Sequence, residues 1–182
     1  IETQFHHLVR TVPASGLLVV NAREEALQRV LAMGSWSTVQ RFGGAREASG
    51  LLRARGEPHD FDVLRGPSKV GNVCWPLMGE HNQLNALAAI AAAQHLGIEP
   101  QQACQSLATF ANVKRRMELR GDVRGVKVYD DFAHHPTAMR LTLDGLRRRA
   151  GTARIVAVFE PRSSTMKRGA MKAQLPWALE EA

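Results

Sequence analysis

Short apolar runs, bounded by glycine, proline and polar residues, divide the first part of the chain into helical and strand-like segments. The run Leu17–Val20 predicts a short buried strand. Ala22–Ala32 predicts a helix, because acids fill its first turn and a glycine follows its end. The next strand-like stretches are Ser37–Phe42, Leu51–Arg55 with Phe61–Leu64, and Lys69–Trp75. Glycine-rich turns separate them, so we expect a small antiparallel section with hairpin turns.

After a linker at residues 111–114, the pattern becomes strand, strand, helix, strand, helix. The predicted elements are Met117–Val123, Val126–Asp131, Pro136–Arg149, Arg154–Phe159 and Ala170–Glu181. The run Ile155–Phe159 is apolar without interruption, as is typical of a parallel strand buried on both faces. The pattern as a whole predicts an α/β fold.

A long alanine-rich helix is predicted to begin at Gly79–Asn82 and to run to Gly97. Its first turns hold His81, Asn82 and Asn85, whose spacings of three and four residues place them on one face of a helix. One amide is explained by helix capping. Two amides and a histidine together are equally consistent with a planar, hydrogen-bonding ligand such as a nucleobase.

The densest cluster of chemically active side chains lies at Val128–Thr137, which reads V-Y-D-D-F-A-H-H-P-T. A strand end delivers Asp130, Asp131, His134 and His135 to the start of a helix, and this is where open α/β sheets bind ligands. The plainer interpretation of the same residues is a polar turn. One βα unit later, the strand Arg154–Phe159 is followed by a second polar loop that contains Arg162 and Lys167.

Composition narrows the functional classes. The chain has 182 residues, 45% of them hydrophobic, without an apolar run long enough to span a membrane. Its net charge of +7 comes from dispersed basic residues, and only 5% of residues are aromatic, so an anionic small-molecule substrate explains the charge better than nucleic acid does. Two scattered cysteines fit a cytoplasmic protein without disulfides. A start at Ile1 and an end inside a helical pattern suggest a piece cut from a longer chain.

Four sequence blocks, in the same order and spacing, resemble the Mur ligase family. They are G-E-H-N-Q-L-N-A at residues 79–86, R-R-M-E at 115–118, Y-D-D-F-A-H-H-P-T at 129–137 and E-P-R-S-S-T-M-K at 160–167. The resemblance implies the end of a central ATPase domain in residues 1–111, with helices and a small antiparallel section. Residues 112–182 would then be the first half of a Rossmann-like C-terminal domain.

The resemblance also implies nucleotide-binding roles for individual residues. In the family the G-x-H-N-x-x-N helix start meets adenine, which would here fall to His81, Asn82 and Asn85. An arginine before an apolar-Glu pair reaches an ATP phosphate, which implies Arg116. The acid at the strand end holds the ribose, which implies Asp131.

Other motif residues would contact the acceptor substrate. The histidines after the strand end face the incoming amine in the family, which implies catalytic roles for His134 and His135. We expect Arg162, Thr165 and Lys167 to bind the carboxylates of that substrate, since a guanidinium fork suits a carboxylate. Ser164 stands where we expect an asparagine in this block.

The fourth block is similar to one branch of the family, which joins UDP-N-acetylmuramate to the murein tripeptide L-Ala-γ-D-Glu-meso-diaminopimelate in cell-wall recycling. The alternative is the branch that adds L-alanine to UDP-N-acetylmuramate. Both use ATP and Mg²⁺ and form an acyl phosphate. The sequence contains no phosphate-binding G-x-x-G-K-[ST] loop, and the family's metal ligands are expected upstream, so we expect these residues alone to be inactive and to hold no metal.

Three other functional classes compete with a ligase. A nicotinamide-binding module is disfavoured because no G-x-G-x-x-G follows a strand. A metal hydrolase could use Asp130, Asp131, His134 and His135, although ligands this close in sequence cannot easily surround one ion. A non-catalytic interaction domain describes the fragment by itself but not the protein that it would come from.

Overall fold

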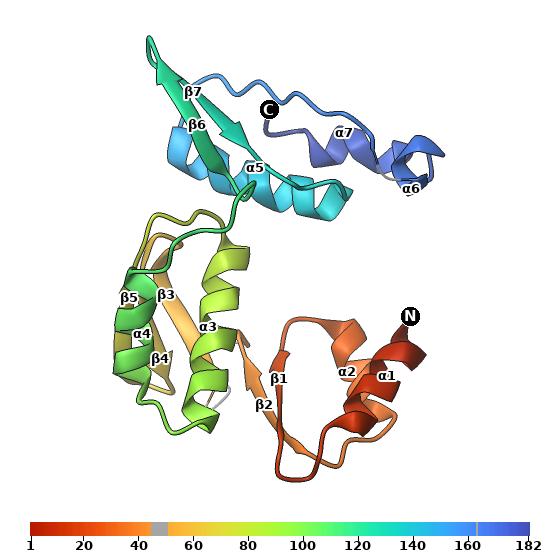
Figure 1. The fold of residues 1–182 in the computed structure, drawn as a ribbon, viewed down its shortest axis with the longest axis vertical. Coiled ribbons are helices and arrows are strands. Elements are labelled where there is room, and N and C mark those ends of the chain that lie inside the picture. The colour runs from red at the N-terminus through yellow and green to blue at the C-terminus, as the bar shows by residue number, and fades with distance from the viewer. Residues whose placement is uncertain (45–50, 163) are drawn as a thin grey trace. The chain divides into compact units, whose positions relative to one another are not determined.

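The structure, a computed structural model, describes residues 1–44, 51–162 and 164–182 (Figure 1). Contacts between residues divide the chain into two compact units. The first unit comprises Ile1–Pro76 and Asn82–Phe110, and the second comprises Leu77–His81 and Ala111–Ala182. The short segment Leu77–His81 therefore belongs with the second half of the chain, although it directly precedes a helix of the first unit.

The first unit contains one five-stranded sheet, in the order β1-β2-β3-β4-β5. Its strands are β1 (Leu17–Asn21), β2 (Thr38–Phe42), β3 (Leu52–Glu57), β4 (Asp60–Arg65) and β5 (Ser68–Cys74). Strands β3, β4 and β5 form the predicted antiparallel section. The assignment of Ser37–Phe42 to that section was wrong, because β2 pairs in parallel with both β1 and β3. The helix between β1 and β2 returns the chain to the starting edge, which allows a parallel pair.

Four helices accompany this sheet: α1 (Glu2–Thr11), α2 (Glu25–Ala32), α3 (Glu80–His95) and α4 (Pro100–Ala108). Helix α1 packs on α2, and α4 packs on β5. Most of the deeply buried side chains of this unit come from the sheet and from α3: Leu52, Phe61, Val63, Val73, Leu87 and Ile90. Alanines on α3 allow the close packing that its sequence predicts, with Ala86 and Ala91 buried.

The contact between β5 and α4 depends on Gly71. A Cβ atom at this position would lie 2.5 Å from the Cys104 sulfur and 3.1 Å from the Cys104 Cβ. We expect Gly71→Ala to lower the free energy of unfolding by about 1–3 kcal/mol through overpacking. Urea denaturation measures the loss, and adding Cys104→Ala should recover part of it. Equal stability of Gly71→Ala and the wild type would show that the contact is looser than described.

A charged cluster crosses β3, β4 and β5 through Asp62. Its carboxylate pairs with Lys69 at 2.5 Å and with Arg55 at 3.0 Å. Hydrogen bonds from Lys69, and then from Arg55, lower the pKa of Asp62 from 3.8 to about 2. A carboxyl group whose pKa is lower in the folded protein stabilises the fold at pH values above its pKa in the unfolded chain. This stabilisation is lost as the pH falls toward the pKa in the folded protein.

We therefore expect the first unit to lose stability between about pH 4 and pH 2, and Asp62→Asn to remove this part of the pH dependence. Urea denaturation midpoints measured across that range test the prediction. Asp60→Asn, on the same strand, is the matched control. An acid transition that is the same in Asp62→Asn and the wild type would contradict it.

The second unit contains the antiparallel hairpin β6 (Glu118–Val123) and β7 (Val126–Asp130), followed by α5 (Pro136–Ala150). Two short helices follow, α6 (Ser164–Lys167) and α7 (Leu175–Ala178), with a 3₁₀ turn at Lys172–Gln174. The predicted helix Ala170–Glu181 was wrong in its length. Pro176 has no backbone N–H to donate and suits only the start of a helix, so α7 begins at Leu175.

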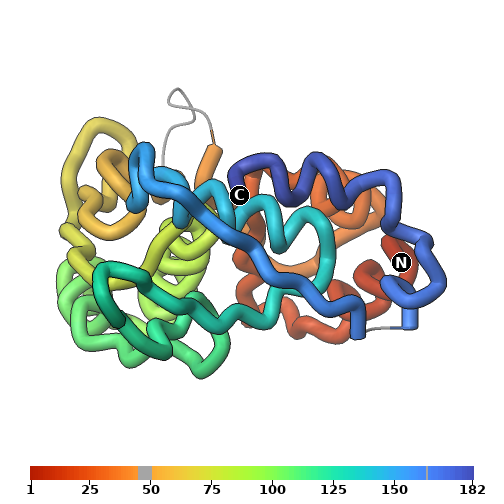
Figure 2. The backbone as a smooth tube through the Cα atoms, turned by 90° about the horizontal axis from the view of Figure 1, so that it is seen from above, coloured from red at the N-terminus to blue at the C-terminus, as the bar shows by residue number. Residues whose placement is uncertain are grey.

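The predicted strand Arg154–Phe159 is absent, and residues 155–160 form an irregular segment (Figure 2). A strand exists only where a neighbour pairs with its backbone, and this segment has no strand partner among the described residues. Its apolar side chains are consequently exposed, 67% for Val156 and 95% for Val158. The expected burial of this run was therefore wrong for the described residues, because no strand pairs with it there.

Two arginines of α5 hold the last residues of the chain. Arg140 pairs with Asp144 and Glu180, at 2.9 and 2.6 Å. Arg147 donates to the backbone carbonyl of Glu181 at 2.7 Å. In the part of the chain that the structure describes, no helix is both long enough and apolar enough to cross a membrane.

Candidate functional site

Asp131 joins three segments of the second unit at the base of the hairpin. Its Oδ2 accepts a hydrogen bond from the backbone N–H of Met117 at 2.8 Å. Its Oδ1 accepts one from the backbone N–H of Ala133 at 2.7 Å. Each carboxylate oxygen retains a further lone pair, so Asp131 can still accept a hydrogen bond from a ligand hydroxyl.

Two adjacent arginines lie over the ring of Phe132. The guanidinium carbons of Arg115 and Arg116 are 5.2 and 5.9 Å from the ring centroid, within cation–π range. Arg115 also pairs with Asp130 at 3.5 Å. The Arg115 guanidinium therefore has an ion-pair partner in addition to the ring, and the interaction described for the Arg116 guanidinium is the one with the ring.

The backbone around these arginines is held in a strained conformation. Arg115 and Met117 have positive φ values of 60° and 50°, which non-glycine residues rarely adopt. The backbone N–H of Phe132 donates to the Arg115 carbonyl at 2.8 Å, and Asp131 holds Met117.

The sequence analysis did not single out Phe132. An aromatic residue between two acids and two histidines is a signal that could have identified it.

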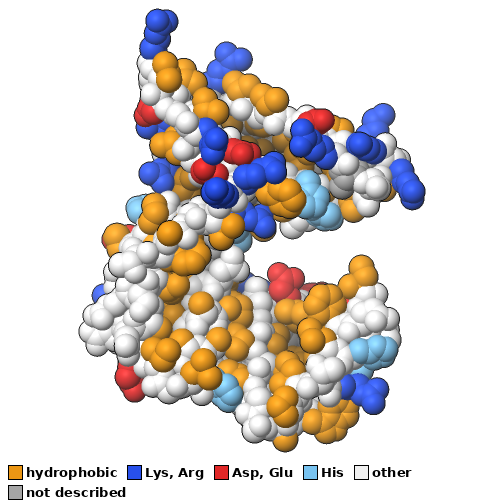
Figure 3. Space-filling view, in the orientation of Figure 1, with side chains coloured by type: hydrophobic (Ala, Val, Ile, Leu, Met, Phe, Trp, Pro, Cys, Tyr) orange, Lys and Arg blue, Asp and Glu red, His pale blue; other side chains and the backbone are white. Residues whose placement is uncertain are grey.

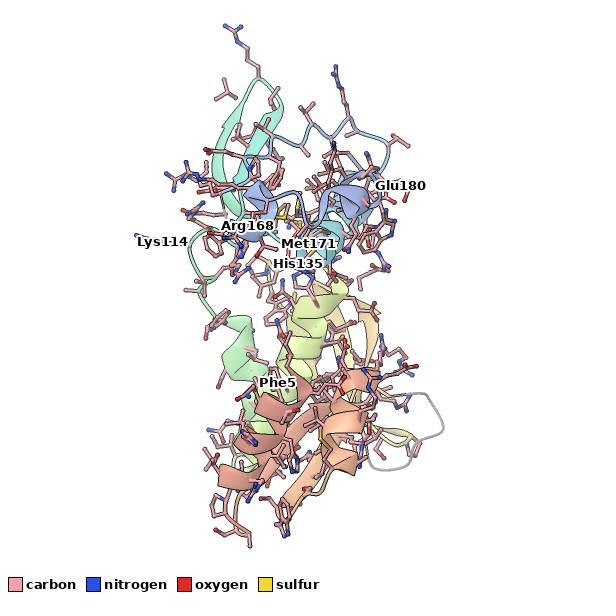
Figure 4. The ribbon with its side chains drawn as sticks, turned by 90° about the vertical axis from the view of Figure 1, so that its right-hand side faces the viewer. Phe5, Lys114, His135, Arg168, Met171 and Glu180 are labelled. Atoms are coloured by element: carbon pink, nitrogen blue, oxygen red, sulfur yellow. The ribbon has the colours of Figure 1, made fainter. Side chains whose placement is uncertain are left out.

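The two predicted histidines are both exposed, and the hydrogen bond at Nδ1 differs between them. His134 Nδ1 lies 3.0 Å from the Phe132 carbonyl oxygen, so Nδ1 carries the proton and Nε2 is the free acceptor. His135 caps α5, where its Nδ1 accepts from the Thr137 N–H at 3.3 Å (Figure 4). Its proton therefore resides on Nε2. Neutral His134 offers a base, and neutral His135 offers a donor.

His81 lies in the same unit as these residues and is half-buried. Its Nδ1 is buried and has no hydrogen-bond partner among the described residues. Burial lowers the pKa of His81 below 6.5, the Asp131 carboxylate opposes this shift, and the Arg116 guanidinium adds to it. A neutral imidazole with an unsatisfied buried nitrogen is suited to hydrogen-bond a neutral ligand group.

Asn82 and Asn85 belong to the first unit, on the first turns of α3. Their spacing places both amides on one side of the helix, as predicted. Asn85 is exposed. Gln83, between them, is buried and donates to the Gly56 carbonyl at 3.3 Å, so it serves the fold of this unit.

Arg162, Thr165 and Lys167 lie in and beside α6, and all three side chains are exposed. The Arg162 guanidinium donates to Glu160 of its own loop at 2.8 Å. Met166 is buried and anchors the short helix. Ser163, the serine of the E-P-R-S block, lies outside the described residues.

Positive charge is concentrated in the second unit. It holds 15 Lys and Arg against nine Asp and Glu, a formal charge of +6 out of +7. On the face shown in Figure 3, the basic side chains gather over this unit. This distribution favours anionic substrates there.

The charged residues of this site are not grouped like metal ligands in the part of the chain that the structure describes. Across residues 1–44, 51–162 and 164–182, no three His, Cys, Asp or Glu side chains are grouped to hold a metal ion. Asp130, Asp131, His134 and His135 all have the other partners described above. A groove of about 430 Å³ in the first unit is lined by Lys69, Val70, Gly71, Asn72, Gln101 and Gln105, none of which was a predicted site residue.

Comparison with known proteins identifies the class. The Mur ligase middle domain matches residues 1–93, and the glutamate ligase domain of Mur ligases matches residues 115–179. The chain belongs to the Mur ligase family.

Particular relatives share much of this sequence. One relative is the UDP-N-acetylmuramate–L-alanyl-γ-D-glutamyl-meso-2,6-diaminoheptandioate ligase of Escherichia coli K12. The two sequences are 49% identical, and the alignment covers all of this chain and 40% of that ligase. The chain is 40% identical to a crystallised murein peptide ligase from Psychrobacter arcticus, with a TM-score of 0.70, covering all of this chain and 38% of that one. It is 38% identical to a UDP-N-acetylmuramate–L-alanine ligase of Rubrobacter xylanophilus, over 88% of this chain and 35% of the relative. The chain thus spans about 40% of the length of two curated relatives named for the tripeptide, those of Escherichia coli and Haemophilus influenzae.

Proposed function

We propose that the protein carrying this sequence is an ATP-dependent ligase that joins UDP-N-acetylmuramate to the tripeptide L-alanyl-γ-D-glutamyl-meso-diaminopimelate. The observation that supports it is the identity of 46–49% over the whole chain to two relatives named for that tripeptide. The L-alanine ligase compared above reaches 38% over 88% of the chain. Addition of L-alanine is therefore the alternative activity. We further propose that the protein acts in the cytoplasm, in peptidoglycan recycling.

The proposed reaction has two steps. The muramate carboxylate attacks the γ-phosphorus of ATP, which forms an acyl phosphate and releases ADP. The tripeptide amine then attacks the acyl carbon, a proton leaves the nitrogen, and inorganic phosphate departs. Both steps develop negative charge on oxygen atoms, so fixed cations accelerate them.

We assign the ATP contacts to the residues that match the nucleotide-binding motifs of the family. His81, Asn82 and Asn85 would contact the adenine, and the orphaned His81 Nδ1 supports this role. Arg116 would contact a phosphate, and Asp131 the ribose, through the lone pairs that Met117 and Ala133 leave free. Mg²⁺ would neutralise the phosphates, but the described residues do not form a site that fits it.

The acceptor amine must lose a proton before it attacks. His134, with Nε2 as its free acceptor, is the proposed base, because imidazole accepts protons near neutral pH. His135 would donate from Nε2 to an oxygen of the substrate. Arg162, Thr165 and Lys167, all exposed, would bind the tripeptide carboxylates.

The test uses the protein encoded by the complete reading frame that contains this sequence. Phosphate release is measured with ATP, Mg²⁺ and UDP-N-acetylmuramate, with either the tripeptide or L-alanine as acceptor. Release with the tripeptide only is the expected result. Release with L-alanine only would establish the alternative, and release with neither would refute both. We expect the 182 residues alone to release no phosphate, because they lack the G-x-x-G-K-[ST] loop.

A further inference from the structure

A glycine in the middle of α5 requires an explanation. Gly145 is the tenth residue of this 15-residue helix, and it is buried. Glycine is disfavoured in helix interiors because it has the most backbone freedom to lose. A glycine at such a position usually permits another backbone to approach closely.

The backbone that approaches Gly145 is that of Gly79. A Cβ atom at Gly145 would lie 2.9 Å from both the Cα and the N of Gly79, and 3.5 Å from the carbonyl carbon of Met78. These are backbone atoms, so a side chain cannot relieve the clash by rotating. Helix α5 and the segment Leu77–His81 therefore meet backbone to backbone, within the second unit.

Gly79 also lies against the ring of His81. A Cβ atom at Gly79 would lie 2.6 and 2.7 Å from the Cε1 and Nδ1 of the His81 imidazole, and 3.5 Å from the Leu141 carbonyl oxygen of α5. Gly79 also has a φ of +85°, which favours glycine. The α5 backbone and the His81 ring thus both lie against Gly79.

We propose that Gly145 is a positioning residue for His81: by leaving room for Gly79 against α5, it fixes where the imidazole lies. Leu141 and Gly145 are four residues apart and share the helix face that receives Gly79. The link to ATP rests on the proposed function, in which His81 contacts adenine. The position of the ring itself does not depend on that function.

The experiment replaces Gly145 by alanine in the complete protein and follows the His81 imidazole by NMR titration. The Cβ atom would push Gly79 away from α5 and expose the ring, so we expect the His81 pKa to move up toward 6.5. The melting temperature should fall, whereas alanine in an unobstructed helix would raise it. Gly121→Ala in β6 is the matched control, because nothing lies within 4 Å of its added Cβ.

Steady-state kinetics separate positioning from the proposed function. Gly145→Ala should raise KM for ATP by about ten- to a hundredfold through misplacement of the ring, and change kcat much less. A moved His81 titration with an unchanged KM would support the positioning role and refute the adenine contact. An unmoved titration with a raised melting temperature would overturn the proposal.

If Gly145→Ala does not fold, the contact between Gly79 and Gly145 can be measured directly in the wild-type protein. The close approach of the two glycine backbones requires a strong nuclear Overhauser effect between the Hα protons of Gly79 and Gly145. Observation of this effect would support the contact, and its absence in a folded, assigned protein would overturn it.

Discussion

Replacing Arg116 by alanine in the complete protein should lower kcat/KM for ATP by about a hundred- to a thousandfold, the usual cost of removing one charge-stabilising donor. Its guanidinium is exposed and lies over the Phe132 ring, so the change removes the proposed phosphate contact without opening a cavity. Phosphate release at varied ATP concentrations measures the effect. Circular dichroism checks that the second unit stays folded.

Arg115→Ala is the matched control. Arg115 lies over the same ring, but it is paired with Asp130, and its proposed role is structural. We expect this variant to lose less than about tenfold, because exposed ion pairs contribute little. Equal losses in the two variants would mean that Arg116 acts through the loop conformation and not through phosphate.

His134→Ala should reduce kcat by about a hundred- to ten-thousandfold, the usual contribution of a general base. The free Nε2 of His134 is the acceptor for the amine proton in the proposed second step. Phosphate release with saturating substrates measures turnover, and added imidazole should restore part of it. A His134→Ala protein with the wild-type turnover number would end this assignment.

The neighbouring His135 provides the comparison. His135→Ala removes the cap of α5 and should cost about 1 kcal/mol of stability. Its proposed role as a donor to substrate predicts a higher KM for the acceptor, and added imidazole should not rescue it. A loss of kcat in His135→Ala that imidazole rescues would exchange the two roles.

The sequence predicted those helices, strands and residue groupings that depend on residues close together along the chain. The helix that carries Asn82 and Asn85, the hairpin that ends at Asp130 and the helix after His135 all formed where pattern and capping residues placed them. Short-range spacing alone brought Asp131, His134 and His135 to one strand end. The charge of the second unit was not predicted, because the basic residues look dispersed until the bounds of the unit are known.

What the sequence could not provide depends on partners distant in the chain. The apolar run 155–159 predicts a strand, but an apolar pattern does not specify which strand would pair with it. The direction of β2 depends on the helix that precedes it and not on its own residues. The contact of Gly145 with Gly79 joins residues 66 positions apart, and no periodicity reports such an approach.

The two backbone N–H groups that donate to Asp131 allow ligand binding at the base of the hairpin to be followed by NMR. Any hydroxyl that shares this carboxylate draws electron density from the hydrogen bonds to the Met117 and Ala133 N–H groups. Their proton chemical shifts would then move upfield together as a ligand binds. Occupancy of the site is therefore readable on two backbone amides, without a label on the ligand and without turnover.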